Sequence, residues 1–191
     1  NRILVHFGLA SLVERSNPGL KALLRIAGLS ERAALQAEDV SFGIAPRINA
    51  AGRIGDARPA LELLTTDDEA EAAELAATLE ALNHERRDLS REAIEAARST
   101  LGADGLAAPD SARALVAEGL VAVRGEWSPG VLGLVAGRLA EEFARPALVG
   151  SVAPDAADET LVRCSIRAPR GFSVASALRA IDEQLIRHGG H

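Results

Sequence analysis

The chain has 191 residues, 48% of them hydrophobic, and a formal net charge of −6. This length and composition predict a soluble globular protein with one large domain or two small ones. The longest apolar run, at 131–137, is far shorter than the ~20 residues of a membrane helix, and the negative charge argues against a general basic surface for nucleic acid. Any contact with phosphate must therefore be local.

Arginine carries almost all the positive charge, since only Lys21 is a lysine among 21 basic residues. Arginine binds a phosphate better than lysine does, because its planar guanidinium can donate two parallel hydrogen bonds. A GC-rich genome would produce the same excess of arginine over lysine. The lone Cys164 can form no disulfide within the chain, which fits a cytoplasmic protein. Because the chain begins at Asn1 and ends at His191 directly after two glycines, we expect a piece of a longer protein.

The first third of the chain is predicted to contain short helices. Two are expected over 1–15 and 18–28, with Asn17 as the N-cap of the second and Gly28 as its stop. A third short helix is expected from Pro59 and packs into the core. Between them, the segment RINAAGR at 47–53 has the composition of a buried turn.

That segment contains Arg47, Asn49 and Arg53 among Ala, Ile and Gly. Charged side chains are rarely buried unless they have a partner. We therefore expect these arginines to meet a negatively charged group.

A long helix is predicted from Thr66 to 102, with a capping threonine, acidic residues in its first turn and alanine throughout. At about 1.5 Å per residue it spans on the order of 50 Å, which is more than one compact domain needs. We expect it to join two domains. Its apolar positions recur at spacings of three, four and seven and form one seam: Leu75, Leu79, Leu82, Leu89, Ala93 and Ala97.

From residue 119 the pattern changes to alternating strands and helices. Strands are expected at 119–125, 146–152 and 160–168, and helices at 128–143 and 173–188. The alternation predicts an α/β unit.

The helix at 128–143 has Ser128 at the expected N-cap and glycines at 130, 133 and 137. Its start either packs a small-residue face on a strand or presents free amides to an anion. Trp127 beside it either stacks on a base or anchors the core.

Two further motifs could bind phosphate. Ser165 and Arg167 fall on one face of a predicted strand, where they could hold a phosphate or a neighbouring carboxylate, and Cys164 faces the other side as a small core residue. The chain ends in Gly189, Gly190 and His191. Paired glycines let the backbone approach a ligand, and a histidine after them can donate to phosphate or take part in proton transfer. The four histidines show no metal-ligand spacing, so no metal site is expected.

Taken in order, PRINAAGR, LNHERR, EWSPGVLGLVAGRLAEEFARP, SIR and GGH resemble the RecJ family of single-strand-specific DNA exonucleases, within the DHH phosphoesterase superfamily. The resemblance covers essentially the whole chain, and RINAAGR is its most specific element. It implies an α/β protein with the C-terminal part of a DHH domain at 1–66, a connecting helix at 67–102 and a DHHA1 domain at 103–191.

The resemblance implies 5′-to-3′ hydrolysis of single-stranded DNA in repair and recombination, with Mn²⁺ or Mg²⁺ held by residues upstream of this chain. The chain alone would then be inactive. We expect a cytoplasmic monomer with repair proteins as partners and no membrane contact. The implied substrate-binding residues are Arg47, Asn49, Arg53, Ser165, Arg167, Gly189 and Gly190, and His191 is the implied catalytic residue beside the reacting phosphate.

Three positions depart from the family pattern. Ser128 stands where a histidine is common, Ala168 replaces a second serine, and Cys164 replaces a glycine. None removes an arginine. Two other functions stay open: a related phosphodiesterase acting on short oligonucleotides or cyclic dinucleotides, and a non-catalytic scaffold that binds DNA or a partner.

Overall fold

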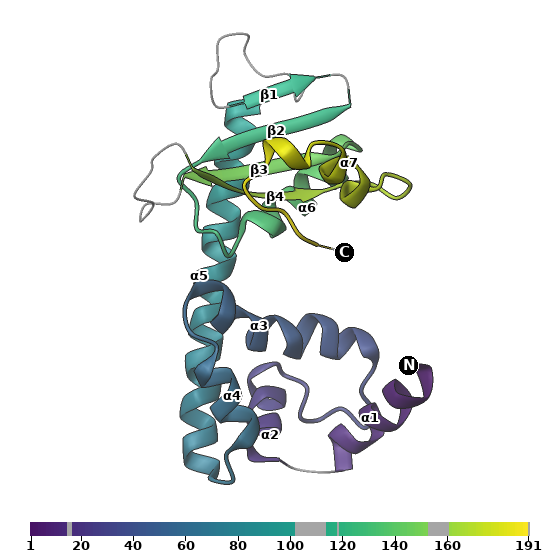
Figure 1. The fold of residues 1–191 in the computed structure, drawn as a ribbon. Helices are drawn as coiled ribbons and strands as arrows, with labels where there is room; N and C mark the ends of the chain where they lie inside the picture. The colour runs from purple at the N-terminus through teal and green to yellow at the C-terminus, as the bar shows by residue number, and fades with distance from the viewer. Residues whose placement is uncertain (15–16, 102–113, 118, 153–160, 191) are drawn as a thin grey trace. The chain divides into compact units, whose positions relative to one another are not determined.

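The computed structural model describes residues 1–14, 17–101, 114–117, 119–152 and 161–190. The chain divides into two compact units, 1–88 and 89–191. In the described residues, the first unit is helical and the second combines a sheet with helices, as Figure 1 shows. The expected α/β class is confirmed.

The first unit starts with α1 (Arg2–Glu14), α2 (Pro18–Ile26) and the π-helix η1 (Asp39–Ile44), followed by α3 (Ala45–Ile54) and α4 (Arg58–Thr65). The predicted N-cap of α2 is confirmed, because the Asn17 side chain accepts a hydrogen bond from the Leu20 amide at 3.0 Å. The same side chain donates to the Leu64 carbonyl at 3.1 Å. Asn17 therefore starts α2 and also fastens it to α4.

Residues 45–54 form the helix α3, so the prediction of a buried turn at RINAAGR was wrong. The helix continues directly from η1, since the Ala45 amide donates to the Val40 carbonyl, and Pro46 lies at the junction, where it removes one amide donor. Ala50 and Ala51 are fully buried. The small residues that suggested a turn instead let a helix pack closely.

The long helix is α5 (Glu69–Leu101), with 33 residues. It begins after the expected Thr66 because Asp68 caps it: the Asp68 carboxylate accepts from the amides of Ala70 and Glu71 at 2.7 and 2.8 Å. Its beginning contributes to the core of the first unit and its end to the core of the second. The buried residues are Ala72, Ala76 and Leu79 in the first core, and Ala93, Ala97 and Leu101 in the second.

The second unit is built on β1 (Ala114–Ala117), β2 (Leu120–Gly125), β3 (Ala147–Val152) and β4 (Val162–Arg167). In the described part of the chain these strands form one sheet in the order β1-β2-β3-β4, with β2 and β3 parallel and the outer pairs antiparallel. The sequence did not predict β1, because four residues are too few to show an alternating pattern.

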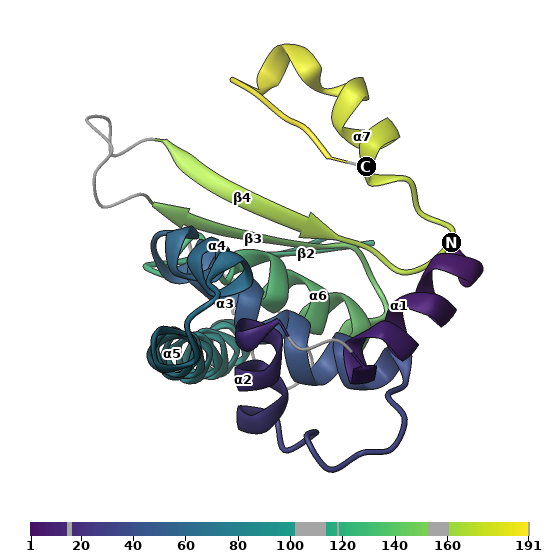
Figure 2. The same ribbon diagram turned by 90° about the horizontal axis from the view of Figure 1, so that it is seen from below.

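The helix α6 (Leu132–Phe143) connects β2 to β3 and covers one face of the sheet, while α7 (Val174–Ala180) lies on the other side (Figure 2). The predicted N-cap at Ser128 was wrong, since α6 begins at Leu132 after Val131. A turn precedes it, in which the Val131 amide donates to the Ser128 carbonyl at 3.1 Å.

The last predicted helix, 173–188, was too long. Only α7 forms, capped by Ser173, and a single 3₁₀ turn, Asp182–Gln184, follows. No residue of α7 is buried. A helix without a packed face gains too little to extend over many turns.

Candidate nucleic-acid interface

The strand β4 places Ser165 and Arg167 on the face of the sheet that α6 covers. Both side chains lie beside Gly133, the second residue of α6: a Cβ built there would lie 3.2 Å from Ser165 Oγ and 3.1 Å from Arg167 Nη2. Only a glycine leaves both groups undisturbed. Three features that the sequence presented separately, a glycine-bearing helix start, a hydroxyl and a guanidinium, therefore meet at one place.

Cys164 faces the opposite side of β4, as predicted. Its sulfur would lie 3.3 Å from a Cβ built at Gly150, the residue paired with it on β3. Burial raises the pKa of the Cys164 thiol. The residue as a whole is exposed, so the prediction of a small core residue was wrong: no residue of β4 is fully buried. A thiol that resists ionisation is also a poor nucleophile.

The hydrogen bonds that Arg167 makes to described residues are short-range. Its Nη1 donates to the Ile166 carbonyl at 2.8 Å and lies 3.5 Å from Ser165 Oγ. None of the salt bridges between described residues includes Arg167. The sequence left two possible partners for Ser165 and Arg167, a phosphate or a carboxylate of the protein. Among the described residues, no carboxylate forms a salt bridge with Arg167.

The turn before α6 is held by a buried serine on β3. Ser151 is 0% exposed, its hydroxyl donates to the Trp127 carbonyl at 2.6 Å, and it accepts from the Trp127 amide at 3.2 Å. The Trp127 ring packs against the core and over Gly125, where a Cβ would lie 2.6 Å from the ring. Trp127 thus anchors the turn, which favours its core role over base stacking.

In the first unit, α3 presents two different faces. Arg47 is buried, and its Nε lies 2.6 Å from Glu80 Oε2 on α5. Asn49 and Arg53 are exposed, one turn apart on the opposite side, with the exposed Gly52 between them. The negatively charged partner expected for these arginines is, for Arg47, a carboxylate of the protein itself.

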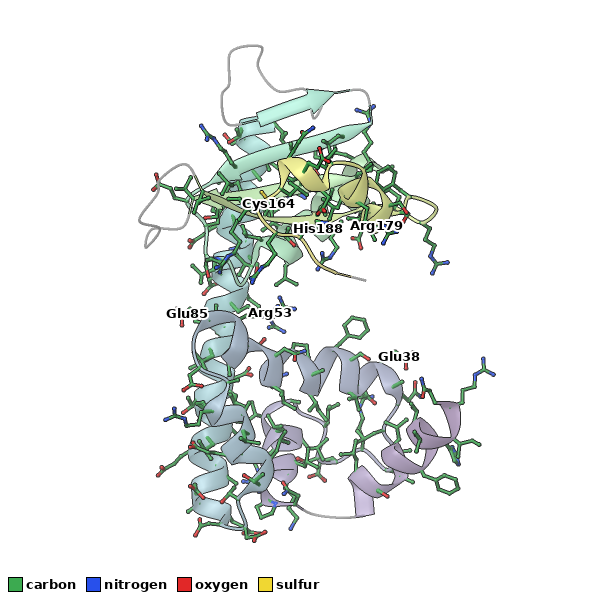
Figure 3. The ribbon with its side chains drawn as sticks, in the orientation of Figure 1. Glu38, Arg53, Glu85, Cys164, Arg179 and His188 are labelled. Carbon is green, nitrogen blue, oxygen red and sulfur yellow. The ribbon has the colours of Figure 1, made fainter. Side chains whose placement is uncertain are left out.

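Arg53 lies near the end of α3 and beside α5, on the side away from Glu85 (Figure 3). The pKa of Arg86 is lowered, mainly by burial and then by the positive charges of Arg87 and Arg53. Positive charge from several arginines is therefore concentrated at this place. Arg86 donates to the side chain of Asn83 at 2.9 Å, and Asn83 is 0% exposed. An anion at this place would relieve the mutual repulsion of the arginines.

The C-terminal motif is described only in part. Gly189 and Gly190 are exposed, and Gly190 has a φ of 143°. His191 lies outside the described residues. The neighbouring His188 contacts Asp182 with 2.8 Å between Nε2 and Oδ1.

The described residues contain no group of three histidine, cysteine, aspartate or glutamate side chains that could hold a metal ion. They therefore do not fit the Mn²⁺ or Mg²⁺ that the family resemblance implies. In the same part of the chain, no helix is long and apolar enough to cross a membrane.

No protein-family model matches the chain. Individual proteins do match over its whole length: it is 35% identical to the single-stranded-DNA-specific exonuclease RecJ of Bacillus subtilis, 36% to that of Thermus thermophilus and 34% to that of Escherichia coli. The crystal structure of Thermus thermophilus RecJ in complex with Mn²⁺ superposes with a TM-score of 0.79 at 34% identity, covering 100% of this chain and 26% of that one.

The resemblance to the RecJ family is confirmed over the whole chain. A second structure, of exonuclease RecJ bound to manganese, gives a TM-score of 0.72 and is covered to 43%. The chain spans 23%, 25% and 32% of the lengths of the Bacillus, Thermus and Escherichia RecJ proteins. It thus corresponds to one segment of RecJ.

Proposed function

We propose that this chain is the part of a RecJ-type exonuclease that holds the phosphates of single-stranded DNA, and that the complete enzyme degrades DNA from the 5′ end in repair and recombination. The observation that carries the proposal is the similarity to RecJ along 100% of the chain in sequence and structure. Residues 1–66 are assigned to a DHH domain, 67–102 to the connecting helix and 103–191 to a DHHA1 domain.

Ser165 and Arg167 are assigned to the 5′-terminal phosphate. A guanidinium and a hydroxyl offer charge-assisted hydrogen bonds to phosphate oxygens, and the first turn of α6 adds the positive end of a helix dipole beside them. The absence of an ion pair at Arg167 within the described residues supports this role. An arginine already paired with a carboxylate would gain less free energy on binding a phosphate, because the existing ion pair would have to be broken.

Asn49 and Arg53 are assigned to the DNA backbone near the scissile phosphate, and Gly189, Gly190 and His191 to the reacting phosphate, with His191 as a catalytic residue. Arginine charge near the phosphoryl oxygens stabilises the charge that develops there. The ligands of Mn²⁺ or Mg²⁺ are assigned to residues outside this chain. The complete enzyme is proposed to be a cytoplasmic monomer that works with other repair proteins.

The test compares the complete enzyme with the isolated 191-residue chain, each with Mn²⁺, on end-labelled DNA. The proposal predicts that the complete enzyme shortens single strands from the 5′ end faster than duplexes, and that the isolated chain cuts neither. Preferential cleavage of cyclic dinucleotides or short oligonucleotides would assign the enzyme to the related phosphodiesterases, and binding without cleavage would make it a scaffold. Manganese-dependent cleavage by the highly purified chain alone would contradict the assignment of the metal ligands to residues outside this chain.

A further inference from the structure

The guanidinium of Arg47 is engaged on all three nitrogens within the protein. Its Nη1 donates to the Gly43 carbonyl, its Nη2 donates to Glu80 Oε1 at 3.1 Å, and its Nε faces Glu80 Oε2 at 2.6 Å. This last pair is not aligned as a hydrogen bond and acts through charge. With the residue 8% exposed, burial and the Glu80 carboxylate leave the guanidinium of Arg47 little surface for a phosphate.

These contacts join three elements. Gly43 belongs to η1, Arg47 to α3 and Glu80 to α5, and His84 one turn along α5 also contacts Glu80, with 3.2 Å between Nε2 and Oε1. The pair is part-buried, with Arg47 the more deeply buried partner, and removing Glu80 would leave the buried guanidinium without its counter-charge. The Arg47–Glu80 pair therefore fixes how α3 lies on α5.

The same helix carries the proposed DNA contacts on its other side. Ala50 and Ala51 are buried, whereas Asn49 and Arg53 are exposed. A rotation or tilt of α3 would move both exposed side chains together, since they stand one turn apart on a helix of ten residues.

We propose that Arg47 is a positioning residue that contacts no DNA: its ion pair with Glu80 holds α3 so that Asn49 and Arg53 meet the DNA backbone. This rests on the proposed function. It separates the two arginines of RINAAGR, which look alike in the sequence, into one that binds the protein and one that binds the substrate.

The salt dependence of DNA binding tells these roles apart. For single strands, each phosphate contact contributes about 0.7 to the slope of log affinity against log salt concentration. In the complete enzyme, Arg53→Gln should flatten the slope by about that amount. Arg47→Gln and Arg47→Lys should weaken binding several-fold and lower the melting temperature, with lysine the milder change. In an Arg53→Gln background, Arg47→Gln should cause no further flattening of the slope, because Arg47 makes no phosphate contact of its own.

Two further variants keep the test decisive if Arg47→Gln does not fold. Glu80→Gln should reproduce the effects of Arg47→Lys. In an Arg53→Gln background, Arg47→Lys should cost less affinity than in the wild type, because Arg47 acts through its neighbour on the exposed face. A merely structural role would lower the melting temperature without changing the affinity measured well below it.

The inference is overturned if Arg47→Gln flattens the slope by a further amount of about 0.7 in the Arg53→Gln background, or if Glu80→Gln strengthens binding by freeing Arg47 for DNA. Unchanged affinity in both Arg47→Lys and Glu80→Gln would also overturn it. Failure of the proposed function gives a different result. The wild-type enzyme would then bind single strands no better than duplexes, or Arg53→Gln would show the same salt dependence of DNA binding as the wild type.

Discussion

Replacing Gly133 with alanine should separate the stability of α6 from the geometry of the phosphate site. The added Cβ would lie 3.1 Å from Arg167 Nη2 and 3.2 Å from Ser165 Oγ, so both groups must shift by a few tenths of an ångström. A hydrogen bond to a charged group contributes about 1.5–3 kcal/mol. Because the shift weakens such bonds without removing either group, we expect a loss of about 1–2 kcal/mol, or roughly 5- to 30-fold.

The assay is kcat/KM of the complete enzyme on a 5′-phosphorylated single strand, with a 5′-hydroxyl strand of the same sequence as reference. The loss should appear on the phosphorylated strand only. Stability should not fall, since alanine is favoured over glycine in helices by up to about 1 kcal/mol.

Gly137→Ala is the matched control, because Gly137 lies one turn further along α6 and a Cβ there meets nothing within 4 Å. It should raise the melting temperature and leave both substrates unaffected. Unchanged kcat/KM of Gly133→Ala on the phosphorylated strand, or an equal loss in both alanine variants, would contradict a phosphate site at Gly133.

Three further changes test the structure around the site. Ser151→Ala should cost about 1–3 kcal/mol of unfolding free energy in chemical denaturation, because it leaves the part-buried backbone groups of Trp127 without this hydroxyl partner; an unchanged midpoint would contradict this. Gly19→Ala should lower the melting temperature sharply, since its Cβ would lie 1.8 Å from a carbonyl oxygen of α4, whereas Gly52→Ala, with a nearest contact of 3.7 Å, should be tolerated; equal melting temperatures would disprove the close packing. Cys164 should react with iodoacetamide at pH 8 more slowly than glutathione does, because its raised pKa leaves less thiolate, and the rate should rise with pH; reaction as fast as glutathione would contradict the raised pKa.

Local patterns predicted much of the fold. Asn17 caps α2 as expected because a cap depends on residues three positions apart, and the two faces of β4 follow from strict alternation along a strand. The start of α6 was misplaced because Ser128 and the proline after it form an equally good turn.

The site was predicted less completely, because its contacts join residues far apart in the sequence. Glu80 lies 33 positions after Arg47, within an acidic helix whose charges otherwise suggest a solvated face. Similarly, no pattern brings Gly133 to Ser165 and Arg167 before the α6–β4 packing is known. The one available signal for the buried arginine was its surroundings of alanine and isoleucine.

The proposed contact of Arg167 with a 5′ phosphate is tested by the ratio of kcat/KM for 5′-phosphorylated and 5′-hydroxyl single strands in Arg167→Ala. Arg145→Ala, exposed just beyond the other end of α6, serves as the control and should keep the wild-type ratio. Arg167→Ala should lower the ratio about 10-fold or more, as expected for the loss of a charge-assisted hydrogen bond. An equal loss on both strands, with the ratio unchanged, would contradict it.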